Sequence, residues 1–447
     1  MSATTLCVLC FLAMLVMTFC GVPVFISMLA SAFAGFVAYA PVVNGAAMTM
    51  NLVITKFADG IYTLGANYNY AVLPLFSLVG ALVSETGVAE GAFECFHRFL
   101  ARVKGGLLYT VVCANAVFGA CSGSSIAGNI VFGRMSIPEL RRRGYDEKLC
   151  YGTIASSGAL STLIPPSMGI LMMCIIAPSN YSPSIDKALS CGIFPGIVTA
   201  IALCLTIFIV GSIKKGSIPP AAKEGFSAQE KLKSLAFLLP ILVLFMLIIG
   251  GTMLGWFPAV VGGAVGAAAC LVYAVIKRLP FKRIWACIVD AAVMEAGIFP
   301  IIIGGQIFSN LVSLTGLANY LSQAVSAMHA PRYVIFLMVL VLYIFCGCIM
   351  DMMSAIIITI PVVFPILCDL GYSPYAIVIT LCFVMEIAGL TPPVGMNVFA
   401  TSNALRVSPS KVFSGVWPFF ICELCMVLLI AFVPGFVEFF PRLIGIM

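Results

Sequence analysis

Two Pro-Pro pairs, each inside a long apolar run, constrain the fold of this chain more than any other feature. The first lies in LIPPSMG (163–169) and the second in GLTPPVGMN (389–397), one in each half of the 447 residues. A proline removes a backbone donor and clashes with the carbonyl one turn earlier, so two prolines beside glycine predict an unwound helix rather than a kink. Unwound backbone at membrane depth is tolerated only where protein or a water-filled cavity surrounds it.

The composition places the chain in a membrane. Of its residues 62% are hydrophobic and only 9% are charged, whereas a soluble domain carries about 25% charged residues. The formal charge of +6 is small and dispersed, so it indicates basic cytoplasmic loops rather than a nucleic-acid site. The first apolar run, 6–20, has no basic residue before it, and we expect a membrane helix there rather than a cleaved signal peptide.

The 18 cysteines do not predict a metal site. None has the spacing of metal ligands, and Cys346 and Cys348 lie one residue apart in an apolar run. A free cysteine behaves as a small hydrophobic residue, so we expect these thiols to pack in the core. No transition-metal site is predicted.

Residues 105–137 do not fit simple membrane crossings. Basic residues stand before the segment (98–104) and after it (141–148), so both of its ends are expected in the cytoplasm. Two crossings need about 20 residues each, but the segment has about 33, and two arms of about 15 residues reach only about 22 Å each. We therefore predict a re-entrant hairpin with GACSGSSIAGN (119–129) at its tip near mid-membrane.

Residues 333–367 repeat this pattern in the second half of the chain. They contain the small-polar break CGCIMDMMS (346–354), and the count of crossings opens this hairpin to the outside. A Pro-Pro break follows each hairpin, at about 43 residues from Ser122 to Pro165 and about 45 from Gly347 to Pro392. A hairpin and a broken helix that occur twice, in opposite orientations, are typical of the inverted repeat of secondary transporters.

The tips and breaks are the candidate binding residues. A helix that stops in mid-membrane leaves N–H groups unpaired at one end and C=O groups at the other; the N–H ends favour carboxylates and the carbonyls favour Na⁺. Hard oxygen donors suit Na⁺ better than a transition metal. In the first unit the candidates are Ser122, Gly123, Ser124, Ser125, Ser156, Gly158, Thr162, Pro165 and Pro166.

The second unit offers a similar set. Its candidates are Gly347, Asp351, Ser354, Glu386, Gly389, Thr391, Pro392, Pro393, Gly395 and Asn397. Asp351 and Glu386 stand out, because ionisable residues at membrane depth are costly and are functional candidates by default. Structural alternatives stay open: Asp351 caps the returning arm, Glu386 bonds the unwound backbone, and the small residues serve helix packing.

An ordered set of motifs resembles the large, DctM-type membrane subunit of tripartite ATP-independent periplasmic (TRAP) transporters over essentially the whole chain. The motifs are GVPV, LPLFSLVGALVSETGVAE, GACSGSSIA with the following RRRGYD, LIPPS, GCIMDMMSAIIITIPV and GLTPPVGMNVFATS. Two positions depart from the family pattern: Met352 stands where proline is common, and Ala388 where glycine is usual. The resemblance is specific because the motifs follow one another in order.

The resemblance implies partners and an energy source. Such subunits work with a periplasmic substrate-binding protein and with a small membrane subunit of about four helices, which we expect to be a separate chain. A Na⁺ gradient drives them, the substrates are mostly organic acids, and the chain is expected in the bacterial cytoplasmic (inner) membrane. No cofactor is expected besides Na⁺ as coupling ion. The related architecture moves like an elevator, in which hairpins and broken helices slide against a fixed scaffold.

The expected fold is thus all-α, an inverted repeat with two re-entrant helical hairpins and two discontinuous helices of the elevator type. The expected division is 1–104, scaffold helices and an interfacial arm; 105–185, a first transport unit with its hairpin at 105–137 and broken helix at 150–177; 186–332, scaffold helices with a cytoplasmic linker at 214–233; 333–400, a second transport unit with its hairpin at 333–367 and broken helix at 375–400; and 401–447, a C-terminal scaffold helix.

Two other functions compete with this one. A stand-alone ion-coupled organic anion transporter of related fold would need no binding protein. An intramembrane enzyme would need a pair of catalytic aspartates or an HExxH motif, and the sequence contains neither arrangement. The chain is therefore expected not to be an enzyme.

Overall fold

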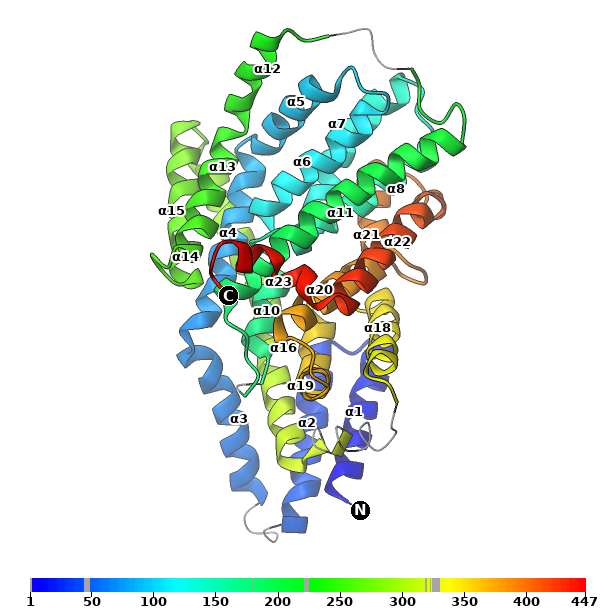
Figure 1. Cartoon of the computed structure of the whole chain (residues 1–447). Coiled ribbons are helices and arrows are strands. Elements are labelled where there is room, and N and C mark those ends of the chain that lie inside the picture. Colours follow the sequence, from blue (N-terminus) through cyan, green and yellow to red (C-terminus); the bar gives the residue numbers. More distant parts are fainter. Residues whose placement is uncertain are drawn as a thin grey trace.

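The chain is helical throughout its described part. The computed structural model describes residues 2–43, 49–178, 180–220, 225–317, 320–321, 323 and 330–447, and every regular element in these ranges is a helix. Six of these helices are long and apolar enough to cross a membrane, or up to nine spans if each bent pair counts as one. The predicted all-α membrane fold is confirmed (Figure 1).

Five helices precede the first hairpin. They are α1 (Ala3–Phe19), α2 (Val24–Val43), α3 (Thr49–Ala66), α4 (Val72–Glu85) and α5 (Val88–Leu100). The axes of the α3 and α4 segments meet at 55°. The amphipathic α5 carries an acidic residue in its first turn and basic residues in its last, which matches the direction of the helix dipole.

The first predicted hairpin and broken helix are present. The hairpin consists of α6 (Gly106–Ser122) and α7 (Ser125–Arg142), which leaves a two-residue tip. The broken helix consists of α8 (Glu147–Ser157), the short α9 (Leu160–Leu163) and α10 (Met168–Ile176). Its two halves are bent by 43° at the Pro-Pro pair, so the sequence does unwind this helix.

The middle of the chain contains both long and very short helices. They are α11 (Ile185–Ile213), α12 (Ala228–Ser234), α13 (Leu239–Phe245), α14 (Gly251–Met253), α15 (Ala259–Ile276) and α16 (Phe281–Thr315), with a π-helical turn at Met246–Gly250 between α13 and α14. The predicted linker 214–233 includes most of α12, and its residues 221–224 lie outside the described part.

The second hairpin and broken helix follow in the same order as the first. The hairpin is formed by α18 (Arg332–Ile349) and α19 (Met352–Asp369), and the broken helix by α20 (Pro374–Ala388) and α21 (Met396–Leu405). Two further helices, α22 (Pro409–Phe432) and α23 (Pro434–Leu443), end the chain. In Figure 1 the α6–α7 hairpin lies in the upper half and the α18–α19 hairpin below it, so they approach the middle from opposite ends.

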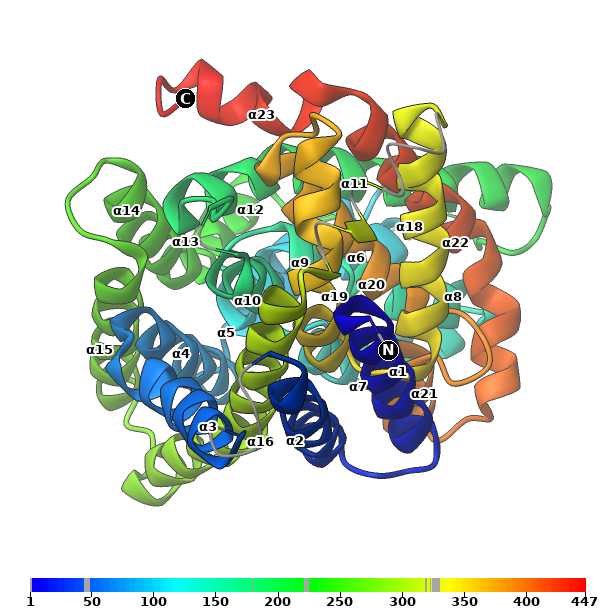
Figure 2. The same cartoon turned by 90° about the horizontal axis from the view of Figure 1, so that it is seen from below.

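The helices pack in two groups that touch at the hairpins. In one group α16 packs against α2, α3 and α4, and α15 packs against α4. In the other, α8 packs against α22, α7 against α21, and α18 against α20 (Figure 2). The contacts between the groups include α4 with α6 and α16 with α19. Because α11 and α22, which belong to the predicted scaffold, pack against α8 and α20 of the predicted transport units, the boundary between a scaffold and a transport part stays a prediction.

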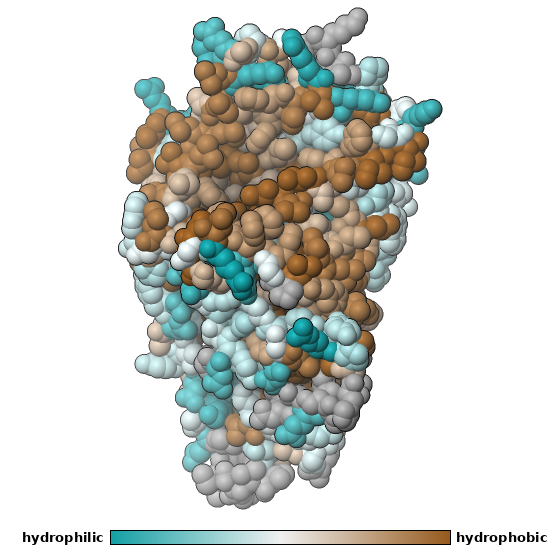
Figure 3. All heavy atoms as spheres, viewed as in Figure 1, coloured by the Kyte–Doolittle hydropathy of each residue, from teal (hydrophilic) through white to brown (hydrophobic). Residues whose placement is uncertain are grey.

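Part of the outer surface is apolar, as expected of a surface that faces lipid. Brown, apolar atoms cover much of the upper half in Figure 3, across α11, α13 and α15. On α11 the side chains of Ile197, Ile201, Leu205 and Phe208 are all exposed, and their spacing places them along one face of the helix. Lys214, which follows α11, forms an ion pair with Asp146, which precedes α8. The loop between α7 and α8 and the segment after α11 therefore lie together.

Candidate functional site

The first hairpin tip is a tight turn with a capped helix behind it. Gly123 has a left-handed φ of +60°, which glycine adopts at little cost. The Ser124 hydroxyl accepts a bond from the backbone N–H of Ala127 at 3.3 Å and so caps α7. A Cβ added to Gly123 would lie 3.0 Å from the carbonyl oxygen of Pro166. The tip therefore touches the first Pro-Pro break, as a shared site requires.

The first break separates two helix ends that face one another. The chain leaves α9 through the extended Ile164 and passes a cis bond between Pro165 and Pro166. The hydroxyl of Ser167 then caps α10, accepting from the N–H of Ile170 at 3.4 Å. The Thr162 hydroxyl donates to the carbonyl of Ala159 at 2.7 Å. Unpaired carbonyls thus end one half-helix and N–H groups begin the other.

The second tip is capped by an aspartate instead of a serine. Asp351 accepts the backbone N–H of Ser354 at 2.9 Å and the hydroxyl of the same residue at 2.5 Å. This bonding makes Asp351 the N-cap of α19, the structural role that the sequence left open. The Asp351 side chain is exposed at the tip, so capping does not exclude contact with a ligand.

The second break is held together by one amide. The Asn397 Nδ2 donates to the carboxylate Oε1 of Glu386 at 2.6 Å and to the carbonyl of Glu386 at 3.3 Å. The Gly395 N–H donates to the carbonyl of Cys348 at 3.3 Å, which ties the unwound segment to the hairpin. The Pro392–Pro393 bond is also cis. The Glu386 carboxylate thus bonds the Asn397 side chain, and it is Asn397 that bonds backbone at the break, at the carbonyl of Glu386.

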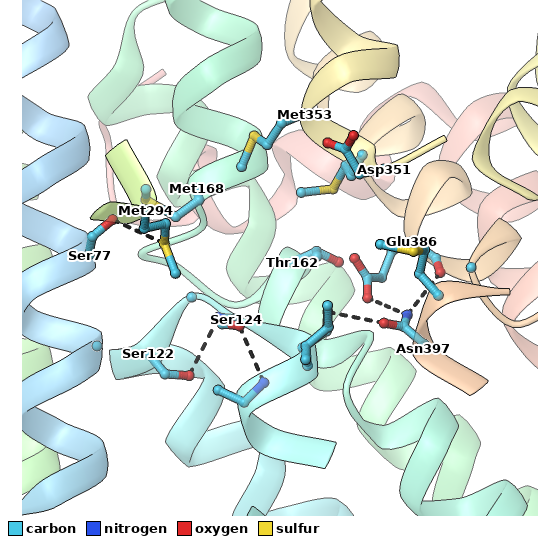
Figure 4. Close-up of a pocket in the computed structure, with 18 of the residues that line it drawn as sticks. Ser77, Ser122, Ser124, Thr162, Met168, Met294, Asp351, Met353, Glu386 and Asn397 are labelled. Atoms are coloured by element: carbon cyan, nitrogen blue, oxygen red, sulfur yellow. Dashed lines mark hydrogen bonds between the residues drawn. The ribbon is translucent and has the colours of Figure 1, made fainter. Parts of the chain in front are cut away.

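Side chains from both units meet directly. The Ser125 hydroxyl of the first unit donates to the Oδ1 of Asn397 in the second at 3.5 Å. A Cβ added to Gly169 in α10 would lie 2.9 Å from Cε of Met352 in α19. Figure 4 shows Ser122, Ser124, Thr162, Asp351, Glu386 and Asn397 around one space. The inverted repeat thus brings its two halves to a single point.

A cavity of about 340 Å³ lies at this meeting point. Ten of the predicted residues line it: Ser122, Gly123, Ser124, Ser125, Thr162, Gly347, Asp351, Glu386, Gly389 and Asn397. Its opposite wall comes from α4 and α16, with Ser77, Ser84, Asp290 and Met294. The cavity therefore lies between the two hairpin units and the helices of the other group.

The remaining predicted residues are not part of the cavity lining. They are Ser156, Gly158, Pro165, Pro166, Ser354, Thr391, Pro392, Pro393 and Gly395, none of which lines the cavity. Several hold the backbone in place: the Thr391 hydroxyl lies 2.7 Å from the Cys348 thiol, and Gly395 has a φ of +64°. Whether any of them contacts an ion stays a prediction.

Sequence reasoning missed the wall formed by α4 and α16 and the methionines. Seven methionines line the cavity: Met168, Met294, Met350, Met352, Met353, Met385 and Met396. Asp290 is an acidic residue in a long apolar run, a signal that could have drawn attention to α16. Ser77 and Ser84 had no such signal, because single serines are ordinary in packed membrane helices.

The charged side chains that the described residues contribute to the cavity wall are all acidic. Among the described residues, Asp290, Asp351 and Glu386 are the ionisable acids that line the cavity, and no Lys, Arg or His lines it. A ligand with a negative charge therefore needs help from helix N-termini or from a bound cation. The methionine thioethers supply an apolar and adaptable surface.

Comparison with known families decides the class of protein. The sequence pattern of the "Tripartite ATP-independent periplasmic transporter, DctM component" family matches residues 11–436. The chain belongs to this family. As a DctM-component permease it is a multi-pass protein of the inner membrane, and its family is one of transporters rather than enzymes.

Curated relatives of this DctM-component permease include transporters with different cargo names. The C4-dicarboxylate TRAP transporter large permease protein DctM of Pseudomonas aeruginosa is 26% identical over 394 residues, 88% of this chain and 90% of that protein. The sialic acid TRAP transporter permease protein SiaT of Haemophilus influenzae is 26% identical over 398 residues, 88% of this chain and 63% of that protein. The 2,3-diketo-L-gulonate TRAP transporter large permease protein YiaN of Escherichia coli is 24% identical over 373 residues, 83% and 86% of the two chains.

A solved structure shares the fold. The YdaH transporter of Alcanivorax borkumensis superposes with a TM-score of 0.64 over 92% of this chain and 98% of that one, at 14% sequence identity. At this identity the match concerns the fold alone. It agrees with the predicted arrangement of two hairpins and two broken helices.

Proposed function

We propose that this DctM-component permease takes up an organic acid together with Na⁺. The observation that carries the proposal is the cavity in which the two hairpin tips, the second break and the helices α4 and α16 meet. A cavity at the repeat interface is where the inverted-repeat plan locates substrate and coupling ions. The cargo names of the relatives, a C4-dicarboxylate, sialic acid and 2,3-diketo-L-gulonate, support an organic acid.

The helix ends supply the contacts for a carboxylate. The N-termini of α7 and α19 begin at the capping residues Ser124 and Asp351, and both residues line the cavity. The N–H groups of a first helical turn and the positive end of the helix dipole favour an anion. A substrate carboxylate between these two ends would be held without a basic side chain.

The acidic wall supports a role for a cation bound beside such a substrate. Asp290, Asp351 and Glu386 would repel a carboxylate at close range, and no described basic side chain of the wall offsets them. The hydroxyls of Ser122, Ser124 and Thr162, together with the carbonyls at the ends of α6 and α9, are hard oxygen donors that suit Na⁺. Na⁺ bound there would compensate the repulsion and couple its own gradient to the uptake.

The motion we propose is an elevator. The hairpin units would slide past α4 and α16, carrying the cavity from one side of the membrane to the other. The methionine lining fits this motion, because an unbranched thioether side chain repacks easily. We further propose that a periplasmic binding protein delivers the substrate and that a separate small membrane subunit completes the permease.

Uptake by reconstituted liposomes tests the proposal. The chain is reconstituted with the small membrane subunit, and uptake of a mixture of labelled organic acids is measured with and without the binding protein, under a Na⁺ or a choline gradient. We expect uptake only with both the binding protein and Na⁺. Uptake by this chain alone would favour the stand-alone transporter, and equal uptake under choline would contradict Na⁺ coupling.

A further inference from the structure

We propose that Glu423 holds a monovalent cation, Na⁺ or H⁺, at a site between α8, α20 and α22, behind the cavity. The site would be separate from the ions at the hairpin tips. The proposal rests on the proposed ion coupling, because the cation at Glu423 is taken to exchange with ions in the cavity. Four observations support it, one in each of the next four paragraphs.

Glu423 is completely buried and has no hydrogen-bond partner. Its side chain is 0% exposed, and neither of its carboxylate oxygens has a partner among the described residues. It lies inside α22, which is long and apolar enough to cross a membrane. An isolated carboxylate in such surroundings costs several kcal/mol even after relaxation. The carboxyl group is therefore neutralised by a bound cation or a bound proton.

A second unpaired oxygen lies on the neighbouring helix α8. A Cβ added to Gly152 of α8 would lie 2.1 Å from the carbonyl oxygen of Gly415 and 3.0 Å from Cε2 of Phe419, both of α22, so the two helices pack closely. Ser156 follows Gly152 by one turn of α8, and Glu423 follows Phe419 by one turn of α22. The Ser156 hydroxyl is also fully buried and without a partner among the described residues. Two unsatisfied groups on helices that pack against each other indicate a missing ligand rather than a single defect.

Glu386 connects this place to the cavity. Glu386 lines the cavity and lies on α20, which packs against α22. Both carboxyl groups are buried, and two buried carboxyl groups on packed helices repel one another when both are ionised. A change of charge on one residue therefore affects the other.

No described basic side chain can take the place of the cation. Besides Glu386, the described charged side chains on α22 and on the helices packed against it stand toward the helix ends, away from the turn of Glu423. They are Glu147 and Lys148 on α8, Asp186 and Lys187 on α11, Lys411 on α22, and Glu438 and Arg442 on α23. The other titratable side chains on these helices are thiols and phenols: Cys150 and Tyr151 on α8, Cys191 and Cys204 on α11, Tyr375 and Cys382 on α20, and Cys422 and Cys425 on α22 itself.

Either cation satisfies the same chemistry. H⁺ requires only the carboxyl group, which becomes a neutral acid. Na⁺ requires the carboxylate with further oxygens, of which Ser156 supplies one. In both cases one positive charge is bound, and it is released when the surroundings of Glu386 change.

Infrared difference spectroscopy of the full chain in lipid nanodiscs distinguishes the two cations. Spectra are recorded as Na⁺ replaces choline and as the pH is raised, for the wild type, for Glu423→Gln, and for Glu147→Gln as the control on a half-exposed carboxylate paired to Arg141. With H⁺ at the site we expect a protonated-carboxyl band that declines with rising pH. With Na⁺ we expect a carboxylate band that shifts when Na⁺ is added. Glu423→Gln loses the band in either case, and Glu147→Gln retains it.

A Glu423 band that responds to neither Na⁺ nor pH would overturn the proposal, and so would spectra of Glu423→Gln that match the wild type. If Glu423→Gln does not fold, Glu423→Asp keeps the carboxyl group and is expected to shift the band. A wild type with a pH response but no Na⁺ response would contradict the proposed Na⁺ coupling while supporting H⁺ at Glu423. Failure of the two proposals can therefore be told apart.

Discussion

The side chain of Asn397 donates a 2.6 Å hydrogen bond to the carboxylate of Glu386 across the second Pro-Pro break. The bond connects the end of α20 with the start of α21, while the seven residues between them are unwound. The Oδ1 of the same amide accepts from Ser125 of the first hairpin. One asparagine thus joins the second break to the opposite repeat.

Asn397→Ala is expected to abolish uptake and to destabilise the second unit. The change leaves the carboxylate of the 5% exposed Glu386 without its closest donor, and an unsatisfied buried polar group costs about 1–3 kcal/mol, or more if it is charged. Thermal unfolding of the purified chain and uptake in liposomes measure the two effects. Asn403→Ala, on the exposed side of the same helix, is the matched control and should behave as the wild type. Equal loss in both variants would contradict the role of Asn397.

Gly80→Ala is expected to slow transport by obstructing the contact between α4 and the first hairpin. A Cβ at Gly80 would lie 2.8 Å from the backbone carbonyl oxygen of Ser122, so one of the two backbones has to move. Overpacking of this kind costs about 1–3 kcal/mol. In the control Gly65→Ala a Cβ meets nothing within 4 Å, and alanine favours a helix by about 0.5–1 kcal/mol over glycine. Initial uptake rates should fall in Gly80→Ala and stay unchanged in Gly65→Ala. An unchanged rate in Gly80→Ala would mean that α4 and the first hairpin do not stay in close contact during transport.

Ser124→Ala is expected to weaken the stabilisation that Na⁺ gives to the chain. The substitution removes the N-cap of α7, worth about 1 kcal/mol, and one hydroxyl of the proposed ion site. We would measure the midpoint of thermal unfolding with increasing Na⁺ in place of choline. Loss of the cap lowers the midpoint at every Na⁺ concentration, whereas loss of a Na⁺ ligand also reduces its rise with Na⁺. In the control Ser414→Ala, an exposed hydroxyl bonded to Lys411, the rise should be unchanged. If Ser124→Ala retains the full rise, Ser124 is not part of an ion site.

A pH effect is expected at the loop between α7 and α8, which contains Asp146. Burial acts to raise the pKa of Asp146, but the bonds from Lys214 and from the N–H of Leu149 outweigh it, so the pKa lies below its usual value. A carboxyl group with a lowered pKa stabilises the folded chain above its unfolded pKa, and this contribution disappears as the pH falls through the lowered folded value. Because the ion pair is near the surface, we expect less than about 1 kcal/mol.

The measurement for Asp146 is the rate of proteolysis in the loop after α7, over a series of decreasing pH. The wild type should become more susceptible as Asp146 takes up its proton. Asp146→Asn should be susceptible at all pH values and show little further change. A pH profile that is the same in both proteins would place the titrating group elsewhere.

Much of the fold could be predicted because membrane helices follow simple rules of length and charge. The re-entrant hairpin at 105–137 followed from too few residues for two crossings, and the break at Pro165 followed from the missing backbone donor. The amphipathic α23, which packs against α11 and α20, was not predicted as a separate helix, because the division by sequence assigned 401–447 to one C-terminal scaffold helix.

The candidate site could be predicted only in part. Residues of the tips, such as Ser124 and Asp351, were identified because interrupted helices expose polar backbone. The wall from α4 and α16 was not, since the sequence does not tell which intact helices lie beside a tip. The roles of Asp351 as a cap and of Asn397 as a bridge depend on side-chain directions, which follow from packing and not from spacing.

Equilibrium binding of radioactive Na⁺ to the purified chain tests most directly whether the two repeats form one ion-coupled site. We would compare the wild type, Ser124→Ala, Asn397→Ala and the double variant, after checking that each is folded. The wild type should bind Na⁺ saturably, each single variant should bind less tightly, and the double variant should lose this binding. Wild-type binding in a folded double variant would contradict the location of the site between the hairpin tips and the second break.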